Sequence, residues 1–157
     1  MSTSELTFFK FEADFVESLR CIPMQVRYKL DTCGVKLKLE HWHKFSQGDR
    51  ERLVTHPCVT PTEIADYRGM VRSTVLQYAE TPPKDLPVDA HPPWLQTAHV
   101  PTEVVAQAHK FDSDIPAEAW AALAPLERFA LCKLSRAGHE NRNFLSALQE
   151  FGLKSSS

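Results

Sequence analysis

The chain has 157 residues, a length typical of one domain, and its 43% hydrophobic and 24% charged residues exclude intrinsic disorder. Its net charge of −2 excludes the overall basic field with which proteins attract nucleic acid or anionic membranes. No apolar run approaches the roughly 20 residues that span a bilayer, and the first residues lack the basic start and apolar middle of a secretory signal. We therefore expect a single domain over residues 1–157, in the cytoplasm, without nucleic-acid or membrane partners.

The first predicted elements lie before Gly34. Residues 6–11 are strand-like, and between residues 15 and 33 apolar side chains recur every three or four positions, which is typical of one helical stripe. This stripe consists of Phe15, Leu19, Ile22, Val26, Leu30 and Cys33. Pro23 interrupts it, because proline lacks an N–H and disfavours helical angles in the residue before it. The pattern predicts two helices or a sharp kink, with an end at Gly34.

Residues 35–39 alternate between apolar and polar side chains, which is typical of a strand. They could pair with residues 6–11 as a short two-stranded ribbon near the N-terminus. The alternative is that both segments lie extended on the helices. A ribbon of this kind would need a helical layer to be stable.

Two helices are predicted next. Ser46 and Asp49 resemble a capping box at the start of a helix that runs to His56. Thr60 and Glu63 form a second box around Pro61, at the start of a longer helix. The apolar stripe of this longer helix consists of Ile64, Tyr67, Val71, Val75 and Tyr78.

A proline-rich connection follows at residues 81–99, and we interpret it as a stiff spacer whose far end is held in the core by Trp94 and Leu95. The alternative is a recognition loop. Beyond it, helix starts are predicted near Pro101, Pro116 and Pro125, and a last helix runs from about residue 140 to 151, ahead of a frayed tail at 154–157. The fold is thus expected to be all-α, one compact domain of about six or seven helices.

Motifs for catalysis are absent from the sequence. The five glycines are scattered, so neither a dinucleotide-binding loop nor a P-loop can form. There is no GxSxG elbow for a serine nucleophile, and His139-Glu140 lacks the second histidine of a zinc-binding helix. We therefore expect that the protein is not an enzyme and has no catalytic or cofactor-binding residues.

One group of residue types suits a metal. It lies within 26 residues and consists of Cys33, His41, His43, His56 and Cys58. Cysteine and neutral histidine bind zinc and iron, but this spacing matches no known finger. We expect surface histidines and free core cysteines, with no metal and no cofactor, and a metal site stays open as the alternative.

A local basic patch is the second candidate site. Arg20 and Arg27 lie seven residues apart, off the apolar stripe, and Lys36 and Lys38 follow them. The ordinary interpretation is a solvated face. The functional interpretation is a surface that binds an acidic partner, and we take these four residues as the candidate partner-binding set.

Two stretches of sequence resemble the nitrate reductase-associated protein family. The first covers residues 11–42, including Phe15, Pro23 and Gly34, and the second contains Arg128-Phe129-Ala130-Leu131-Cys132 and Asn141-Arg142-Asn143-Phe144. The resemblance extends from about Phe8 to Leu153. It implies a protein needed for active assimilatory nitrate reductase, an enzyme with a molybdenum–pterin cofactor and an iron–sulfur cluster, and it carries over no functional residues.

The resemblance therefore implies an accessory role, namely assembly, cofactor insertion or stabilisation of nitrate reductase through protein–protein binding. The alternative is a small metal or redox carrier that uses the Cys/His group. The sequence does not indicate the oligomeric state, or whether binding to the partner is transient.

Overall fold

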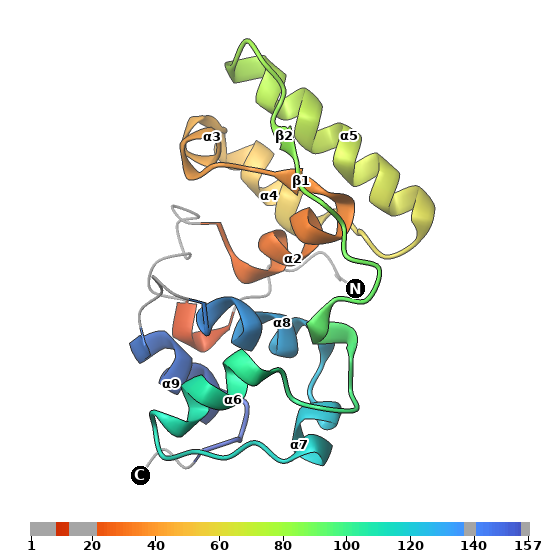
Figure 1. Cartoon of the computed structure of the whole chain (residues 1–157). Helices are drawn as coiled ribbons and strands as arrows, with labels where there is room; N and C mark the ends of the chain where they lie inside the picture. The colour runs from red at the N-terminus through yellow and green to blue at the C-terminus, as the bar shows by residue number, and fades with distance from the viewer. Residues whose placement is uncertain (1–8, 13–21, 137–140, 155–157) are drawn as a thin grey trace, which may run out of the picture. The chain divides into compact units, whose positions relative to one another are not determined.

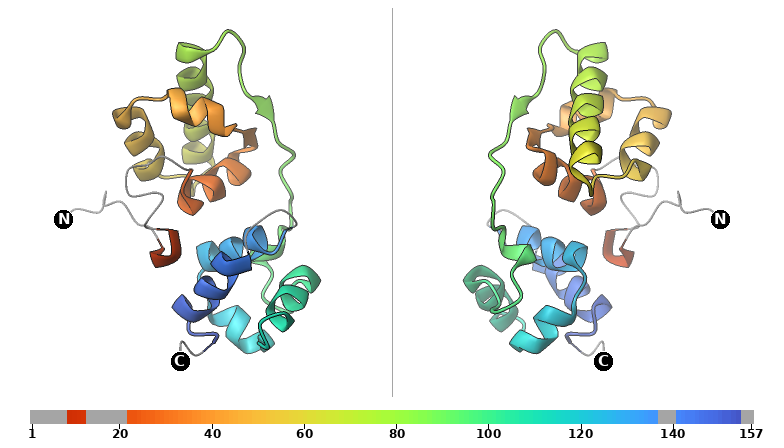
Figure 2. Two further views of the ribbon diagram at one scale, coloured as in Figure 1. Left: turned by 90° about the vertical axis from the view of Figure 1, so that its left-hand side faces the viewer. Right: turned by 90° about the vertical axis from the view of Figure 1, so that its right-hand side faces the viewer.

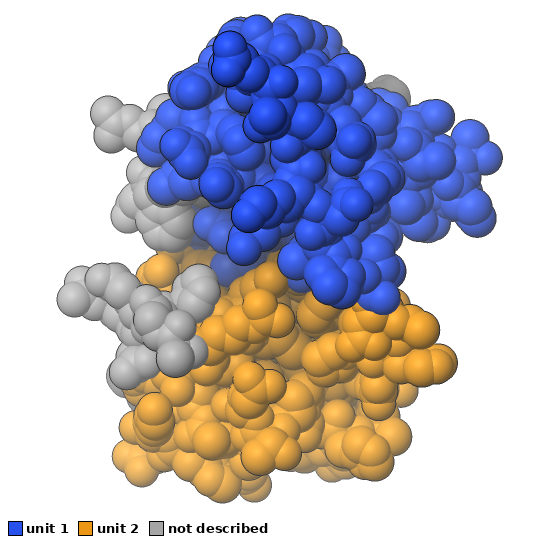
Figure 3. All heavy atoms as spheres, turned by 45° about the horizontal axis from the view of Figure 1, so that its top comes forward, with its two compact units in different colours: residues 1–8, 12–88 blue, residues 9–11, 89–157 orange. Residues whose placement is uncertain are grey.

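A computed structural model describes residues 9–12, 22–136 and 141–154. In these residues it contains eight α-helices, two 3-10 helices and two short strands (Figure 1). The all-α prediction is confirmed, with one or two helices more than expected. The described residues form two compact units, the first made of 12 and 22–88, and the second of 9–11, 89–136 and 141–154 (Figure 3). The expectation of one domain stays a prediction.

Helix α2 (Met24–Cys33) opens the first unit. It starts directly after Pro23 and ends at Gly34, whose φ of 79° is the left-handed conformation that glycine adopts without strain. The predicted break and end are thus confirmed, whereas residues 13–21 lie outside the described part of the chain. The buried carboxylate of Glu12 accepts a hydrogen bond from the N–H of Met24 at 3.1 Å and so caps the helix.

A short ribbon is present, but one of its strands is not the predicted one. Strand β1 (Val35–Lys36) pairs antiparallel with β2 (Lys84–Asp85) from the proline-rich connection. In residues 6–11, the described part includes a 3-10 helix, η1 (Lys10–Glu12), in place of the end of a strand. The predicted strand also ends early, because Leu39 already begins a helix.

Three further helices complete the first unit: α3 (Leu39–Lys44), α4 (Gln47–Thr55) and α5 (Pro61–Tyr78). The predicted capping boxes are confirmed, since Ser46 Oγ accepts the Asp49 N–H at 3.0 Å and Thr60 Oγ1 accepts the Glu63 N–H at 3.2 Å. After α5 the chain turns back beside that helix to reach β2 (Figures 1 and 2). The largest fully buried side chains of this unit are Trp42, Tyr67, Leu53, Val26 and Val35.

The second unit contains η2 (Pro93–Leu95), α6 (Thr102–His109), α7 (Ala117–Ala122), α8 (Pro125–Leu134) and α9 (Asn141–Glu150). The three proline starts are confirmed, as is the end of α9 near Gly152, which has a φ of 75°. Trp94 is buried as predicted, but Leu95 is 51% exposed, so the prediction that it enters the core is wrong. The core consists mainly of Trp120, Phe129, Leu131, Phe144 and Leu148.

Of the tail predicted at 154–157, only Lys154 is described. Its N–H donates to the carbonyl of Leu148 at 3.2 Å. Within the described residues, no helix combines the length and apolar composition that crossing a bilayer requires.

Candidate functional site

The ribbon is fixed to the end of helix α2 by main-chain contacts. Gly34 lies between α2 and β1, and its carbonyl accepts a hydrogen bond from the N–H of Leu86 at 2.8 Å. A Cβ atom at Gly34 would lie 2.8 Å from Cγ2 of Val88 and 3.0 Å from the Leu86 carbonyl. The absence of a side chain at Gly34 therefore allows the segment after β2 to lie directly against the helix end.

Arg68, from α5, completes this attachment. Its Nη1 donates to the carbonyls of Cys33 and Gly34 at 3.1 and 3.0 Å. Its Nη2 forms an ion pair with Asp85 at 2.6 Å, and Arg72 approaches the same carboxylate at 3.5 Å. The guanidinium thus closes the last turn of α2 and holds β2 at the same time.

The register of the ribbon places two lysines on its outward face. Val35 lies opposite Asp85, and Lys36 lies opposite Lys84. Val35 is buried and faces the inside of the unit, whereas Lys36, Lys84 and Asp85 are all exposed. Like charges directly opposite each other destabilise a ribbon. The fold therefore maintains an arrangement that its own stability does not favour.

The four predicted partner-binding residues are distributed as follows. Lys36 is on the ribbon, and Lys38 caps the start of α3, 3.9 Å from Glu40. Arg27 is half-buried on α2, where its Nε donates to the carbonyl of Ile22 at 3.0 Å. Arg20 lies outside the described residues. The side chains of Arg27 and Lys38 thus have contacts in different parts of the unit.

The predicted Cys/His group divides between two environments. Cys33 and Cys58 are buried and free, and their thiols donate to the carbonyls of Leu30 and Lys29 at 3.7 and 3.8 Å. His56 follows α4 and lies 6.0 Å, ring to ring, from Tyr67. The other two histidines are on α3, where His41 Nδ1 accepts the N–H of Lys38 and His43 is exposed. No set of three or more such residues that could hold a metal occurs in the part of the chain that the structure describes.

Burial governs the chemistry of the two thiols. Burial, and after it the nearby Cys58, raises the pKa of Cys33 to about 12. Burial also raises the pKa of Cys58 to about 11, against the opposing charge of Lys29. Both thiols are therefore protonated at neutral pH, the unreactive form of cysteine.

Lys29 and Tyr67 satisfy the open end of α4. The Lys29 ammonium donates to the carbonyls of Val54 and His56 at 2.6 and 2.8 Å, and the Tyr67 hydroxyl donates to that of Leu53 at 2.6 Å. Burial lowers the pKa of Lys29, against the opposing effect of Cys58, and burial raises the pKa of Tyr67 well above its usual value. These carbonyls have no partner within the helix, so the contacts stabilise its last turn.

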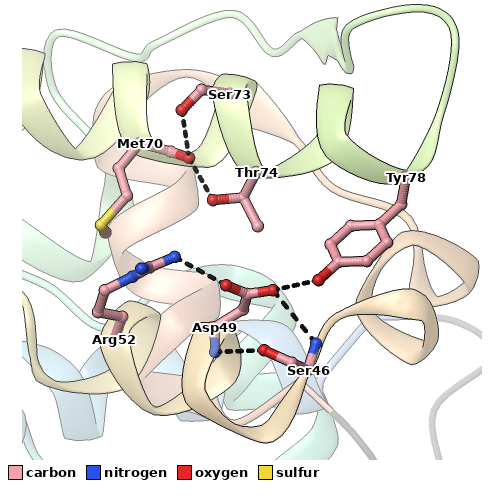
Figure 4. A network of polar contacts seen from close by, with 7 residues as sticks. All are labelled: Ser46, Asp49, Arg52, Met70, Ser73, Thr74 and Tyr78. Carbon is pink, nitrogen blue, oxygen red and sulfur yellow. Dashed lines mark hydrogen bonds and ion pairs between the residues drawn. The ribbon is translucent and has the colours of Figure 1, made fainter.

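A polar network joins α4 to α5 around Asp49 (Figure 4). The carboxylate accepts hydrogen bonds from the Tyr78 hydroxyl at 2.7 Å and the Ser46 N–H at 3.2 Å, and it pairs with Arg52 at 2.8 Å. Burial would raise the pKa of Asp49, but these contacts, first that with Tyr78, lower it overall. The network positions two helices, so the contacts of Asp49 serve the fold.

The sequence model of the conserved nitrate reductase-associated protein family matches residues 8–151. The chain belongs to this family. No curated protein and no solved structure matches the chain.

Sequence reasoning missed Lys84, Arg68 and the role of Arg128. All three lie within the residues that the family model matches, and Arg128 also lies in one of the two stretches that carry the resemblance. Arg128, on α8, is 5% exposed, and its hydrogen bonds within the described residues go to main-chain carbonyls. The acceptors are Trp94 at 2.6 Å, Leu123 at 2.5 Å, Ala121 at 3.3 Å and Trp120 at 3.4 Å. The guanidinium ties η2 and the end of α7 to α8, which makes Arg128 a structural residue of this family member.

Proposed function

We propose that the chain is a non-catalytic accessory protein of assimilatory nitrate reductase and acts by binding the enzyme or its precursor. The observation that carries this proposal is the family match over residues 8–151. The family name gives the association with nitrate reductase. The accessory role, through assembly, cofactor insertion or stabilisation, is our inference from it.

The contacts of the polar side chains support a role in binding. Lys29, Arg68 and Arg128 hold main-chain carbonyls, and Asp49 holds two helices together. These side chains serve the fold. A helical protein built in this way acts most simply through its surface, by contact with another protein.

The alternative, a metal or redox carrier, has less support. Cys33 and Cys58 are protonated at neutral pH, and a metal binds the thiolate, so binding would have to displace both protons. We expect elemental analysis of protein purified without an affinity tag to find no stoichiometric zinc or iron. About one metal per chain, lost in Cys33→Ser or Cys58→Ser, would establish the carrier function instead.

The decisive experiment is deletion of the gene in the source organism, with nitrate reductase activity and polypeptide measured separately on nitrate medium. We expect lower activity. Lost activity with normal polypeptide would indicate cofactor assembly or electron delivery, and loss of both would indicate a stabilising partner. Normal activity in the deletion strain would refute the accessory role.

A further inference from the structure

The outward face of the ribbon carries cations that the fold does not neutralise. Lys36 and Lys84 are exposed and directly opposite each other, and neither forms an ion pair with any described residue. Their mutual repulsion disfavours the ribbon. Pairs of residues that lower the stability of a fold, as these two lysines do, are expected at sites where a function requires them.

The acidic residues around the ribbon do not remove this excess of positive charge. Asp85 is shared between Arg68 and Arg72, and Glu40 lies 3.9 Å from Lys38 with 69% of its side chain exposed. The whole chain has a net charge of −2, so these cations do not simply follow from an overall basic composition. The positive charge is local to the ribbon.

Exposed apolar side chains accompany the lysines. Val88 is 59% exposed and lies against Gly34, next to β1, and Leu39, which is 47% exposed, directly follows Lys38. Protein–protein interfaces commonly combine apolar contacts with a charged rim. We call the set Lys36, Lys38, Leu39, Lys84 and Val88 the ribbon surface.

We propose that the ribbon surface binds an acidic segment on the surface of nitrate reductase. This inference rests on the proposed function and names the part of the chain that makes the contact. Arg27 is not included, since its Nε is already bonded to Ile22. An acidic protein segment fits better than duplex nucleic acid, whose binders neutralise about 6–10 phosphates, whereas the ribbon surface contains three exposed lysines.

Because Lys36 and Lys84 are paired across the ribbon, reversing the charge of one of them should affect stability and partner binding in opposite directions. In K36E or K84E the new carboxylate faces the remaining lysine, so an unfavourable pair becomes a favourable one. We expect the melting temperature to stay the same or rise, while affinity for nitrate reductase falls by about tenfold or more. In the double variant K36E/K84E like charges again oppose each other, so stability returns to that of the wild type while affinity falls further.

The matched control reverses two lysines of the second unit, K110E/K154E, and changes the net charge by the same amount as the double ribbon variant. Dissociation constants for purified nitrate reductase from the same organism are measured by calorimetry at low and raised salt. We expect the control to bind like the wild type, and binding of the wild type to weaken as salt increases.

The outcomes distinguish the two proposals. If K36E, K84E and K36E/K84E all bind nitrate reductase as tightly as the wild type, the ribbon surface is not the binding site, and the accessory role still stands. A ribbon-dependent affinity for a DNA duplex probe, with reductase binding unchanged, would also overturn the ribbon surface as the binding site. If the wild-type chain does not bind nitrate reductase at all, the accessory role itself fails, and the surface assigned to it fails as well.

Discussion

Two arginines that hold main-chain carbonyls show how differently the two units are fixed. Arg68, in the first unit, has 36% of its side chain exposed and pairs with Asp85 as well as with two carbonyls. Arg128, in the second unit, is 5% exposed and binds four carbonyls. A buried guanidinium is costly to desolvate and costly to remove.

The first unit spreads its polar attachments over several side chains. Lys29 and Tyr67 close α4, Arg68 closes α2, and Asp49 joins α4 to α5. In the second unit, the single side chain of Arg128 joins three elements, and Trp120 Nε1 adds a bond from α7 to the carbonyl of Gln96. We therefore expect a single substitution to do most damage at Arg128, and each of the following variants tests that difference.

The largest effect is expected for Arg128→Met, which keeps an apolar stem and removes the guanidinium. Four carbonyls would lose a partner, two of them bonded at 2.6 Å or less, so the free energy of unfolding should fall by about 3 kcal/mol or more. Urea unfolding followed by circular dichroism measures it. The control is Arg136→Met, an exposed arginine in the same unit, for which we expect a change within about 0.5 kcal/mol. If the two variants are equally stable, Arg128 does not have the special importance for the second unit that its four hydrogen bonds predict.

The next largest effect is expected for Gly34→Ala. The left-handed conformation costs an alanine about 1–2 kcal/mol, and here the Cβ would also meet Val88 at 2.8 Å and the Leu86 carbonyl at 3.0 Å. Gly152 in the second unit has nearly the same φ, and nothing lies within 4 Å of its Cβ position. Gly152→Ala therefore measures the conformational cost alone. The two variants should differ by about 1 kcal/mol or more if crowding acts at Gly34, and an equal loss would show that the segment after β2 moves away freely.

Arg68→Ala should destabilise the first unit by about 1–2 kcal/mol, because the Arg68 side chain is 36% exposed and water can partly replace the guanidinium. The matched variant is Arg72→Ala, because Arg72 approaches the Asp85 carboxylate at 3.5 Å without bonding to a carbonyl in the described part of the chain. It should change stability by less than about 0.5 kcal/mol. If Arg68→Ala lowers the free energy of unfolding as much as Arg128→Met does, the exposure of the arginine side chain does not determine how much stability its removal costs.

Asp49→Asn should destabilise the protein by about 1–2 kcal/mol at neutral pH, and the effect should depend on pH. The contacts of the carboxylate lower its pKa in the folded state. Its contribution is therefore present above the unfolded pKa of about 3.9 and is lost as pH falls through the lower folded value. Urea midpoints of the wild type and the variant should thus converge below about pH 4. A difference that stays constant down to low pH would exclude ionisation of Asp49 as its cause.

The smallest effect, and a favourable one, is expected for Gly69→Ala. Gly69 is exposed within α5, and nothing lies within 4 Å of the position its Cβ would take. Alanine favours a helix over glycine by about 1 kcal/mol, so the melting temperature should rise by a few degrees. A destabilised Gly69→Ala variant would contradict this expectation, because nothing lies near the position of the new methyl group.

Helix starts were predictable because their determinants are local. Ser46 with Asp49, and Thr60 with Glu63, lie three residues apart, so each capping box can be recognised without knowledge of the rest of the fold. The same holds for the prolines near the starts of the helices in the second unit and for Gly34 after α2.

The partner of β1 was not predictable in this way. Lys84 and Asp85 show no alternation, lie between prolines, and pair with β1 because Arg68 and Gly34 hold them there. The ribbon surface could likewise be predicted only in part. Lys36 and Lys38 were predicted as cations that could bind a partner, whereas Lys84 joins them only through the register. Long-range pairing of two-residue strands leaves no pattern in the sequence.

The ribbon has a consequence for the order in which the first unit folds. Val35 and its partner Asp85 are about fifty residues apart in the chain. Pairing the two strands in an unfolded chain would therefore close a large loop at a high cost in entropy, and this cost falls once the helices between the strands have folded. We expect the contacts of the ribbon to be absent from the transition state. Gly34→Ala should then accelerate unfolding in stopped-flow measurements and leave the refolding rate nearly unchanged. The amides of the ribbon would accordingly exchange with solvent by local opening, well before those of α5.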